Sequence, residues 1–253
     1  MNLKKRVVAG AVLLAAGLFA AQSQAAVVFS DTFTYPDGPL VGAPGSTWAT
    51  HSGTPGQVNV ASNVVQLTET ESEDVNAPLA GAPYASGTLY AGADFKFTAL
   101  PSGTGGYFFH LKDNGTTAFK GRVFASTTGA AAGDYRIGIA NAGNTPVFIP
   151  TDLVPGDSHH FVVGYDTASG IATLYLDSPT ETGGTVGTDA PSPVGITTVA
   201  MRQSLSSGNG MGQLNIDNVV VSTSYSEALS IPEPATLGLA AFGLLALSRR
   251  RRA

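Results

Sequence analysis

The central part of the chain alternates short apolar runs with clusters of glycine, proline and small polar residues. Between Val27 and Tyr225, apolar residues do not recur at helical spacing over ten or more residues. In the run from Leu89 to Phe97, by contrast, every second residue is apolar. Residues two apart on a strand lie on the same face, so the pattern predicts a strand whose odd-numbered residues face the core.

The clearest predicted strands cover residues 27–33, 64–68, 88–97, 106–112, 118–126, 135–140, 159–166, 171–176, 199–203 and 213–222. Asn114-Gly115 predicts a tight hairpin turn with positive φ angles. Residues 166–170 predict a glycine-ended loop between two paired strands. About a dozen strands at this spacing favour a two-sheet sandwich or jelly roll over a barrel or propeller. No repeat of about 20 to 50 residues is present, which argues against a solenoid.

The N-terminus has the three parts of a secretory signal. Lys4, Lys5 and Arg6 precede an uninterrupted apolar run over residues 7–21. Small residues then favour cleavage by signal peptidase between Ala25 and Ala26. A retained membrane anchor is the alternative, but an apolar run of about fifteen residues is short for a span.

The C-terminus combines a proline motif, an apolar run over residues 235–247 and a basic end. The motif is Pro232, Glu233 and Pro234, and the basic end is Arg249, Arg250, Arg251 and Arg252. The two prolines keep the approach extended, and the arginines favour the cytoplasmic side of a membrane. Physical reasoning alone therefore predicts an exported domain tethered to the inner membrane by its tail.

This order of motif, apolar helix and arginines closely resembles a PEP-CTERM sorting signal. The resemblance covers about 23 residues, and it implies processing by an exosortase at or beside Pro232-Glu233-Pro234. It further implies that the membrane anchor is transient. Delivery would then be to the cell surface or the exopolysaccharide matrix of a Gram-negative bacterium.

The body resembles concanavalin A-like domains of the LamG type. The resemblance rests on residues 29–35, Trp48 and residues 109–113, 160–166, 174–177 and 216–221. It implies an all-β, two-sheet jelly-roll sandwich whose first and last strands are adjacent, and it implies glycan or matrix binding. The predicted organisation is a signal helix at 1–25, the sandwich at 26–225, a linker at 226–230 and the sorting signal with its short hydrophobic helix at 231–253.

Composition narrows the function classes further. The chain has 253 residues and no cysteine, which rules out disulfides and thiolate metal sites. Seven of the thirteen basic residues lie in the two ends, so residues 26–231 carry six basic and seventeen acidic residues, a net charge of −11. An acidic body argues against nucleic acid as a partner and against docking onto anionic lipid.

Three glutamates in sequence alternation, Glu69, Glu71 and Glu73, invite a catalytic interpretation. The spacing is similar to the carboxylate ladder of jelly-roll β-glucanases, in which one carboxylate is the nucleophile and another the acid. In those enzymes the alternate residues are apolar, whereas here they are Thr70 and Ser72. We therefore interpret the segment as a solvated acidic loop that is not catalytic and is dispensable for folding.

Metal chemistry has one candidate site. Asp31 on the first strand and Asp217 on the last would come close if those strands pair, which makes them candidate ligands of a structural Ca²⁺. The alternative is that both bond to turn amides. His51, His110, His159 and His160 show no metal-binding spacing, and neighbours on a strand face opposite sides. No other cofactor is predicted.

Sugar-binding sites combine an aromatic platform with planar polar side chains. The candidate platforms are Trp48, Tyr84, Tyr107 and Tyr135, of which Trp48 has a core residue as its alternative interpretation. The sequence favours an exported, non-catalytic protein that binds carbohydrate or matrix polysaccharide. A secreted β-glucan hydrolase and a purely structural matrix protein are the alternatives.

Overall fold

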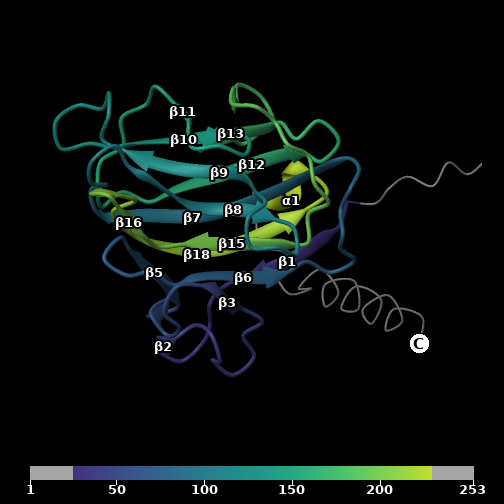
Figure 1. The fold of residues 1–253 in the computed structure, drawn as a ribbon, viewed down its shortest axis with the longest axis horizontal. Coiled ribbons are helices and arrows are strands. Elements are labelled where there is room, and N and C mark those ends of the chain that lie inside the picture. The colour runs from purple at the N-terminus through teal and green to yellow at the C-terminus, as the bar shows by residue number, and fades with distance from the viewer. Residues whose placement is uncertain (1–24, 230–253) are drawn as a thin grey trace, which may run out of the picture.

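The computed structural model describes residues 25–229, which form two antiparallel sheets packed face to face (Figure 1). The predicted all-β, two-sheet sandwich is confirmed. Nearly all of the predicted signal peptide and the entire predicted sorting signal lie outside the described residues. Within residues 25–229, no helix combines the length and the apolar character needed to cross a membrane.

Sheet A has the strand order β14-β13-β12-β7-β18-β5-β4-β2, and β1 also pairs with β18. Its strands are β1 (Val27–Asp31), β2 (Gly38–Pro39), β4 (Asn59–Ala61), β5 (Val64–Thr68), β7 (Thr88–Ala99), β12 (His159–Asp166), β13 (Ala172–Leu176), β14 (Thr185–Val186) and β18 (Gln213–Ser222). The pairing of β1 with β18 confirms that the first and last strands of the domain are adjacent.

Sheet B has the order β11-β10-β9-β8-β15-β6-β3. Its strands are β3 (Ala49–Ser52), β6 (Asp74–Pro78), β8 (Gly106–Lys112), β9 (Phe119–Ser126), β10 (Arg136–Ala140), β11 (Val147–Phe148) and β15 (Thr198–Arg202). A separate small hairpin joins β16 (Leu205–Ser206) to β17 (Asn209–Gly210), and the helix α1 (Tyr225–Ala228) follows β18.

The core fills the space between the sheets as the alternation on β7 predicts. The odd-numbered residues from Leu89 to Phe97 are all buried. Phe95 and Phe97 on β7 meet Phe108 on β8 of the opposite sheet, with ring centroids 6.3 and 5.7 Å apart. These aromatic contacts join the two sheets, since each ring buries a large apolar area.

A bulge in β18 overturns the simple alternation expected for this strand. Asn218 has a φ of +53°, and the register with β7 shifts between Asp217 and Val220. Asparagine adopts this left-handed conformation more readily than most residues. The phase of the strand therefore changes, and Ile216 and Val219 both enter the core although the alternation had placed them on opposite faces.

The two predicted hairpins form, but one turn differs from the prediction. β8 pairs with β9, and β12 pairs with β13 through a loop in which Gly170 has a φ of +75°. Between β8 and β9, however, neither Asn114 nor Gly115 has a positive φ. The connection is a longer loop in which the Asp113 carboxylate accepts a hydrogen bond from the Gly115 amide at 2.8 Å. The prediction of a tight turn was wrong.

The acidic segment before β6 is not a solvated loop throughout. Glu73 is fully buried, and its carboxylate accepts hydrogen bonds from the Thr50 hydroxyl and from the backbone amides of Gln57 and Val58. Glu69 accepts a hydrogen bond from the Gly212 amide at 2.7 Å. The segment crosses from β5 in sheet A to β6 in sheet B, and its carboxylates satisfy backbone donors that the crossing leaves free.

The helix α1 packs on the outer face of sheet A. Tyr225 and Ala228 form a second small apolar cluster with Tyr90 on β7 and Val162 on β12. Tyr225 also contacts Tyr175 edge to face, with ring centroids 4.9 Å apart. The predicted linker at 226–230 therefore begins inside a packed helix, and the folded domain extends at least to Ala228.

Candidate functional site

The outer face of sheet B carries aromatic rings and guanidinium groups. Val123 and Ala125 on β9 point into the core, so Phe124 between them points outward. Its ring centroid lies 5.4 Å from that of Tyr107 on β8. Two guanidinium groups lie near the same tyrosine ring, Arg202 at 4.3 Å and Arg122 at 5.0 Å from the centroid.

A hollow of about 510 Å³ opens at one end of this face. We call it the sheet B hollow, and it combines aromatic rings, side-chain amides and a guanidinium group. The aromatic, amide and basic side chains that line it are Tyr107, Phe124, Phe148, Asn144, Asn209 and Arg202. Arg122 borders it, since its Nη1 donates a hydrogen bond to Asn144 Oδ1 at 2.7 Å.

Two histidines lie beside the hollow within this basic face. His110 is fully buried, and its ring lies 6.0 Å from His51 and 4.6 Å from Phe119. Burial, together with the nearby charge of Lys112, lowers the pKa of His51 to about 4. Burial and the surrounding positive charges also lower the pKa of His110. Both rings are therefore neutral at physiological pH.

The ring nitrogens of His51 and His110 have no hydrogen-bond partner among residues 25–229. Neutral imidazole nitrogens can bind transition metals, but Lys112, Arg122 and Arg202 all add positive charge around His110. A metal cation there would be repelled by three basic residues.

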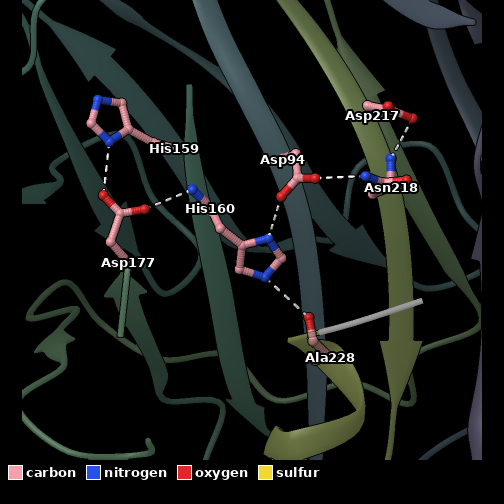
Figure 2. A network of polar contacts seen from close by, with 7 residues as sticks. All are labelled: Asp94, His159, His160, Asp177, Asp217, Asn218 and Ala228. Atoms are coloured by element: carbon pink, nitrogen blue, oxygen red, sulfur yellow. Dashed lines mark hydrogen bonds and ion pairs between the residues drawn. The ribbon is translucent and has the colours of Figure 1, made fainter. Parts of the chain in front are cut away.

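The outer face of sheet A carries a second polar arrangement, which we call the His–Asp network (Figure 2). His160 Nδ1 lies 2.7 Å from Asp94 Oδ1, and Asn218 Nδ2 donates to Asp94 Oδ2 at 2.6 Å. On the adjacent strand pair, His159 Nδ1 lies 2.7 Å from Asp177 Oδ2. His159 and His160 thus face different carboxylates, as their neighbouring positions on a strand require.

The network borders a pocket of about 460 Å³ between β7, β12 and β18. Asp217 and Asp94 are cross-strand neighbours at its floor. Burial raises the pKa of Asp217, and the negative charges of Asp94 and Asp31 raise it further. The hydrogen bond from the Asn218 amide lowers this pKa but does not outweigh them. Burial also acts on Asp94, but hydrogen bonds from His160 and Asn218 outweigh it and leave the pKa of Asp94 below its usual value.

His160 also bonds to the last turn of the folded chain. Its Nε2 lies 3.1 Å from the carbonyl oxygen of Ala228 in α1, while its Nδ1 faces Asp94 (Figure 2). The His160 ring therefore lies between Asp94 on β7 and the last turn of α1, and it connects sheet A to the helix.

The predicted aromatic platforms divide into two groups. Trp48 and Tyr135 are buried in the core, so neither offers a ring face to a sugar, and this part of the prediction was wrong. Trp48 instead donates a hydrogen bond from Nε1 to Asp31 at 2.8 Å. Tyr84 is half-buried, and its hydroxyl bonds to the Ala80 carbonyl. Of the four, Tyr107 alone lines a hollow of the described residues that contains other candidate ligand-binding groups.

The candidate calcium ligands have other roles. The Asp31 carboxylate accepts hydrogen bonds from the Phe33 amide, the Tyr35 hydroxyl and the Trp48 indole. Asp217 accepts one from the Asn218 amide, and burial favours its protonated form. No group of three or more His, Asp or Glu within residues 25–229 is arranged to hold a metal ion. The alternative interpretation of turn-capping carboxylates describes both residues.

Sequence reasoning missed the His–Asp network and the sheet B hollow for the same reason. Asp94 and His160 are 66 positions apart, and Tyr107, Arg122 and Arg202 come from three strands. The register between strands decides which outward side chains meet, and a single sequence does not encode register in a readable form. A surplus of cations on the predicted strands of one sheet is the signal that could have indicated the hollow.

Comparison with known families identifies the C-terminal tail. Residues 230–252 match the family described as the PEP-CTERM protein-sorting motif, so the resemblance inferred from the motif, apolar run and arginines is confirmed. The sorting residues Pro232, Glu233, Pro234 and Arg249–Arg252 lie within this match and outside the described residues. No curated protein matches the chain.

Solved structures similar to the chain include lectin domains and sialidases. Lectin II from Ulex europaeus is 15% identical over 70% of this chain and 92% of the lectin, with a TM-score of 0.46. The Emp47p carbohydrate recognition domain is 14% identical over 75% of this chain and 94% of that domain, with a TM-score of 0.43. A sialidase is 14% identical, with a TM-score of 0.48 over 78% of this chain, but this chain spans only 19% of the sialidase. Similarity at this level does not bear on function.

Proposed function

We propose that the protein is exported, sorted to the cell surface or matrix by an exosortase, and binds carbohydrate there without catalysis. The sorting motif at residues 230–252 supports the first part. The N-terminal sequence supports export, because basic residues, an apolar run and small residues before Ala26 have the order of a secretory signal.

The observation that supports carbohydrate binding is the composition of the sheet B hollow. Tyr107 and Phe148 supply aromatic surface, Asn144 and Asn209 supply amides, and Arg202 supplies planar donors. Sugars are recognised by this combination, because their C–H faces pack on rings while their hydroxyls bond to planar polar groups. A volume of about 510 Å³ is within the range of small-ligand sites.

The chemistry of the hollow favours binding over hydrolysis. Glycoside hydrolysis commonly needs two carboxyl groups on opposite sides of the scissile bond. Asp74 is the single acidic residue on the strands of sheet B, and it is buried beside Ser52. The hollow therefore lacks the carboxylate pair among its described lining residues.

A second candidate function follows from the pocket on sheet A. Asp94 and Asp217 are neighbours whose pKa values are displaced in opposite directions, as in acid and base pairs. Hydrolysis at this pocket would make the protein a glycosidase. Both oxygens of Asp94 are, however, engaged by His160 and Asn218.

A glycan array combined with a reducing-sugar assay tests the binding function. The purified protein should retain at least one glycan, and Tyr107→Leu should weaken that binding about tenfold because one stacking ring is lost. Tyr84→Leu is the matched control, since Tyr84 lies outside the hollow, and it should bind normally. Sugar release that disappears in Asp94→Asn would instead establish the hydrolase, while retained binding in Tyr107→Leu would move the site elsewhere.

Intact-mass analysis of protein from the host surface tests the sorting function. The expected chain begins at Ala26 and ends near Pro232. A chain that still carries Arg249–Arg252 would contradict processing by an exosortase and leave a simple tail anchor.

A further inference from the structure

Charge is segregated between the two sheets. Five of the six basic residues in the body lie on strands of sheet B, together with one acidic residue, Asp74. The strands of sheet A carry four acidic residues and one basic residue. Because the body has a net charge of −11, this positive sheet stands out against a negative molecule.

Two guanidinium groups lie at the hollow, and a third cation, Lys112, lies farther along the same face of sheet B. Arg122 and Arg202 both lie within about 5 Å of the Tyr107 ring centroid, at 5.0 and 4.3 Å. Lys112 is almost fully buried on the neighbouring strand β8. Burial lowers the pKa of both Lys112 and Arg122, which shows that the protein environment opposes these charges.

The protein supplies little negative charge in return. Arg202 Nε is 4.0 Å from Asp74, a distance too long for a hydrogen bond, and burial raises the pKa of Asp74. Arg122 bonds to the neutral amide of Asn144, and its Nε is buried with no partner in the part of the chain that the structure describes. By contrast Arg136, which lies outside the hollow, has a direct ion pair with Asp152 at 2.5 Å.

We infer that the carbohydrate bound in the sheet B hollow is an acidic polysaccharide whose sugar rings carry carboxylates. This inference rests on the proposed carbohydrate-binding function and names its ligand class. A carboxylate placed at Arg202 would receive planar, charge-assisted hydrogen bonds, and the Tyr107 and Phe148 rings would border the sugar ring. The positive charge of the nearby Arg122 would also stabilise the same carboxylate.

A neutral glycan would leave this arrangement unexplained. It would bury Arg202 and Arg122 further without supplying a counter-charge, and two like charges would then lose screening by water. A uronate removes the same cost, because it brings one negative charge to a site where the protein has placed several positive ones. The acidic remainder of the surface would confine a polyanion to this face.

The experiment compares each polysaccharide with its uncharged counterpart. Oligogalacturonate and oligoalginate are titrated into the purified protein by calorimetry, alongside the same sugars with their carboxylates reduced to alcohols. We expect the reduced forms to bind at least about tenfold more weakly, which is the value of a lost charge-assisted hydrogen bond. Raising the salt concentration should weaken binding of the carboxylated forms and leave the reduced forms unchanged.

Two variants locate the charge that matters. Arg202→Gln should weaken oligouronate binding about tenfold, whereas Arg136→Gln, a cation of the same sheet with its own carboxylate partner, should bind normally. Arg202→Lys keeps the charge without the planar fork and should fall between them. Thermal unfolding of each variant shows whether the fold is retained, and the comparison of carboxylated and reduced sugars in the parent stands without any variant.

The outcomes separate this inference from the function on which it rests. Equal affinity for carboxylated and reduced forms, or binding of neutral glycans alone on the array, would overturn the acidic ligand and keep carbohydrate binding. No binding to any glycan would overturn both. Displacement of oligouronate by single-stranded DNA at equal charge would also overturn the inference, because it would show a general polyanion site.

Discussion

The helix α1 covers part of the outer face of sheet A, whereas no helix of residues 25–229 covers the outer face of sheet B. On sheet A, α1 adds a second apolar layer over Tyr90 and Val162, and the polar residues beside it form His–Asp pairs at the edge of a pocket. On sheet B, the rings of Tyr107 and Phe119 lie beside the guanidinium groups of Arg122 and Arg202. Two faces with the same strand alternation thus differ in chemistry.

On each sheet, the chemistry of the outward residues matches what covers that face. Long basic side chains can cover apolar surface with their stems while their heads stay near water. They suit a face that meets a polar ligand. The outer face of sheet A meets the protein's own chain, and its carboxylates are satisfied internally by His160, Asn218 and His159.

The largest effect is expected where the edges of the two sheets are held together. Glu73 lies on the crossing from sheet A to sheet B and accepts three hydrogen bonds while fully buried. Glu73→Gln should lower the free energy of unfolding by about 3 kcal/mol, because the amide turns a donor toward donors in a buried site. Urea denaturation measures this loss.

Glu71→Gln is the matched control for that substitution. Glu71 is only half-buried, and we expect a change within about 0.5 kcal/mol. If the two variants unfolded at the same urea concentration, the three hydrogen bonds of the buried Glu73 carboxylate would not stabilise the fold as proposed.

A smaller loss is expected when sheet A loses its cover. A chain that ends at Ser224 lacks Tyr225 and Ala228, which exposes Tyr90 and removes the acceptor of His160 Nε2. We expect about 2.5 kcal/mol of lost stability relative to a chain that ends at Leu229. Glycan binding in the sheet B hollow should be equal in the two chains. Reduced binding in the shorter chain would show that the faces are coupled.

Acid should act on sheet B through its neutral histidines. His51 has a folded-state pKa of about 4, below its usual value near 6.5, so the unfolded chain binds its proton first as the pH falls. Stability is therefore full above about pH 6.5 and is lost progressively down to about pH 4. Between about pH 7 and pH 5, His51 alone should account for about 2 kcal/mol.

The parent and His51→Phe should be compared by thermal unfolding across this range. The variant should show the smaller loss, and the difference between the two proteins cancels opposing contributions from Asp74 and Asp217, whose pKa values are raised. If the variant lost stability in acid as much as the parent, His51 would not be the cause of that loss.

The smallest effect is expected at the bond between sheet A and α1. His160→Gln can donate to Asp94 or to the Ala228 carbonyl but cannot bridge both in the same way. We expect about 1 kcal/mol of lost stability at neutral pH, the usual value of one hydrogen bond. Amide hydrogen exchange should show the change in α1 and leave the strands of sheet B protected. Faster exchange throughout sheet B would contradict a local role.

The fold was readable because strand alternation and turn residues are local signals. β5, β8, β12 and β18 have the bounds that the runs predicted. β3, β4 and β6 were not among the clearest runs, because their sequences mix His51, Asn59, Asp74 and Asn76 with few apolar residues. These strands form through contacts with residues that are distant in sequence, such as Glu73 for β3. The local propensity of a segment gives no information on such contacts.

Among the residues that line the sheet B hollow, only Tyr107 was predicted from the sequence. An isolated aromatic residue on a predicted strand has equal chances of facing inward or outward until the bulges are known. Tyr107 and Phe109 are separated by such a shift in the pairing of β8 with β9, and Gly121 has a φ of +54° within β9. These irregularities set which side chains gather at the hollow, and they have no clear signature in composition.

The pairing of β1 with β18 has a mechanical consequence. Ala26 and Thr223 bond to each other across this pair, so the start of β1 and the end of β18 are held together. Opposing forces on those ends would peel β1 from β18 one bond at a time. The sheet B hollow lies instead by the start of β18, where Gly106 approaches Met211, and α1 packs on sheet A toward the other end of that strand (Figure 1). If the proposed polymer is bound in the hollow, a load between it and the C-terminal side of the domain would run along roughly 30 Å of strand, where the ladder bonds share it in shear.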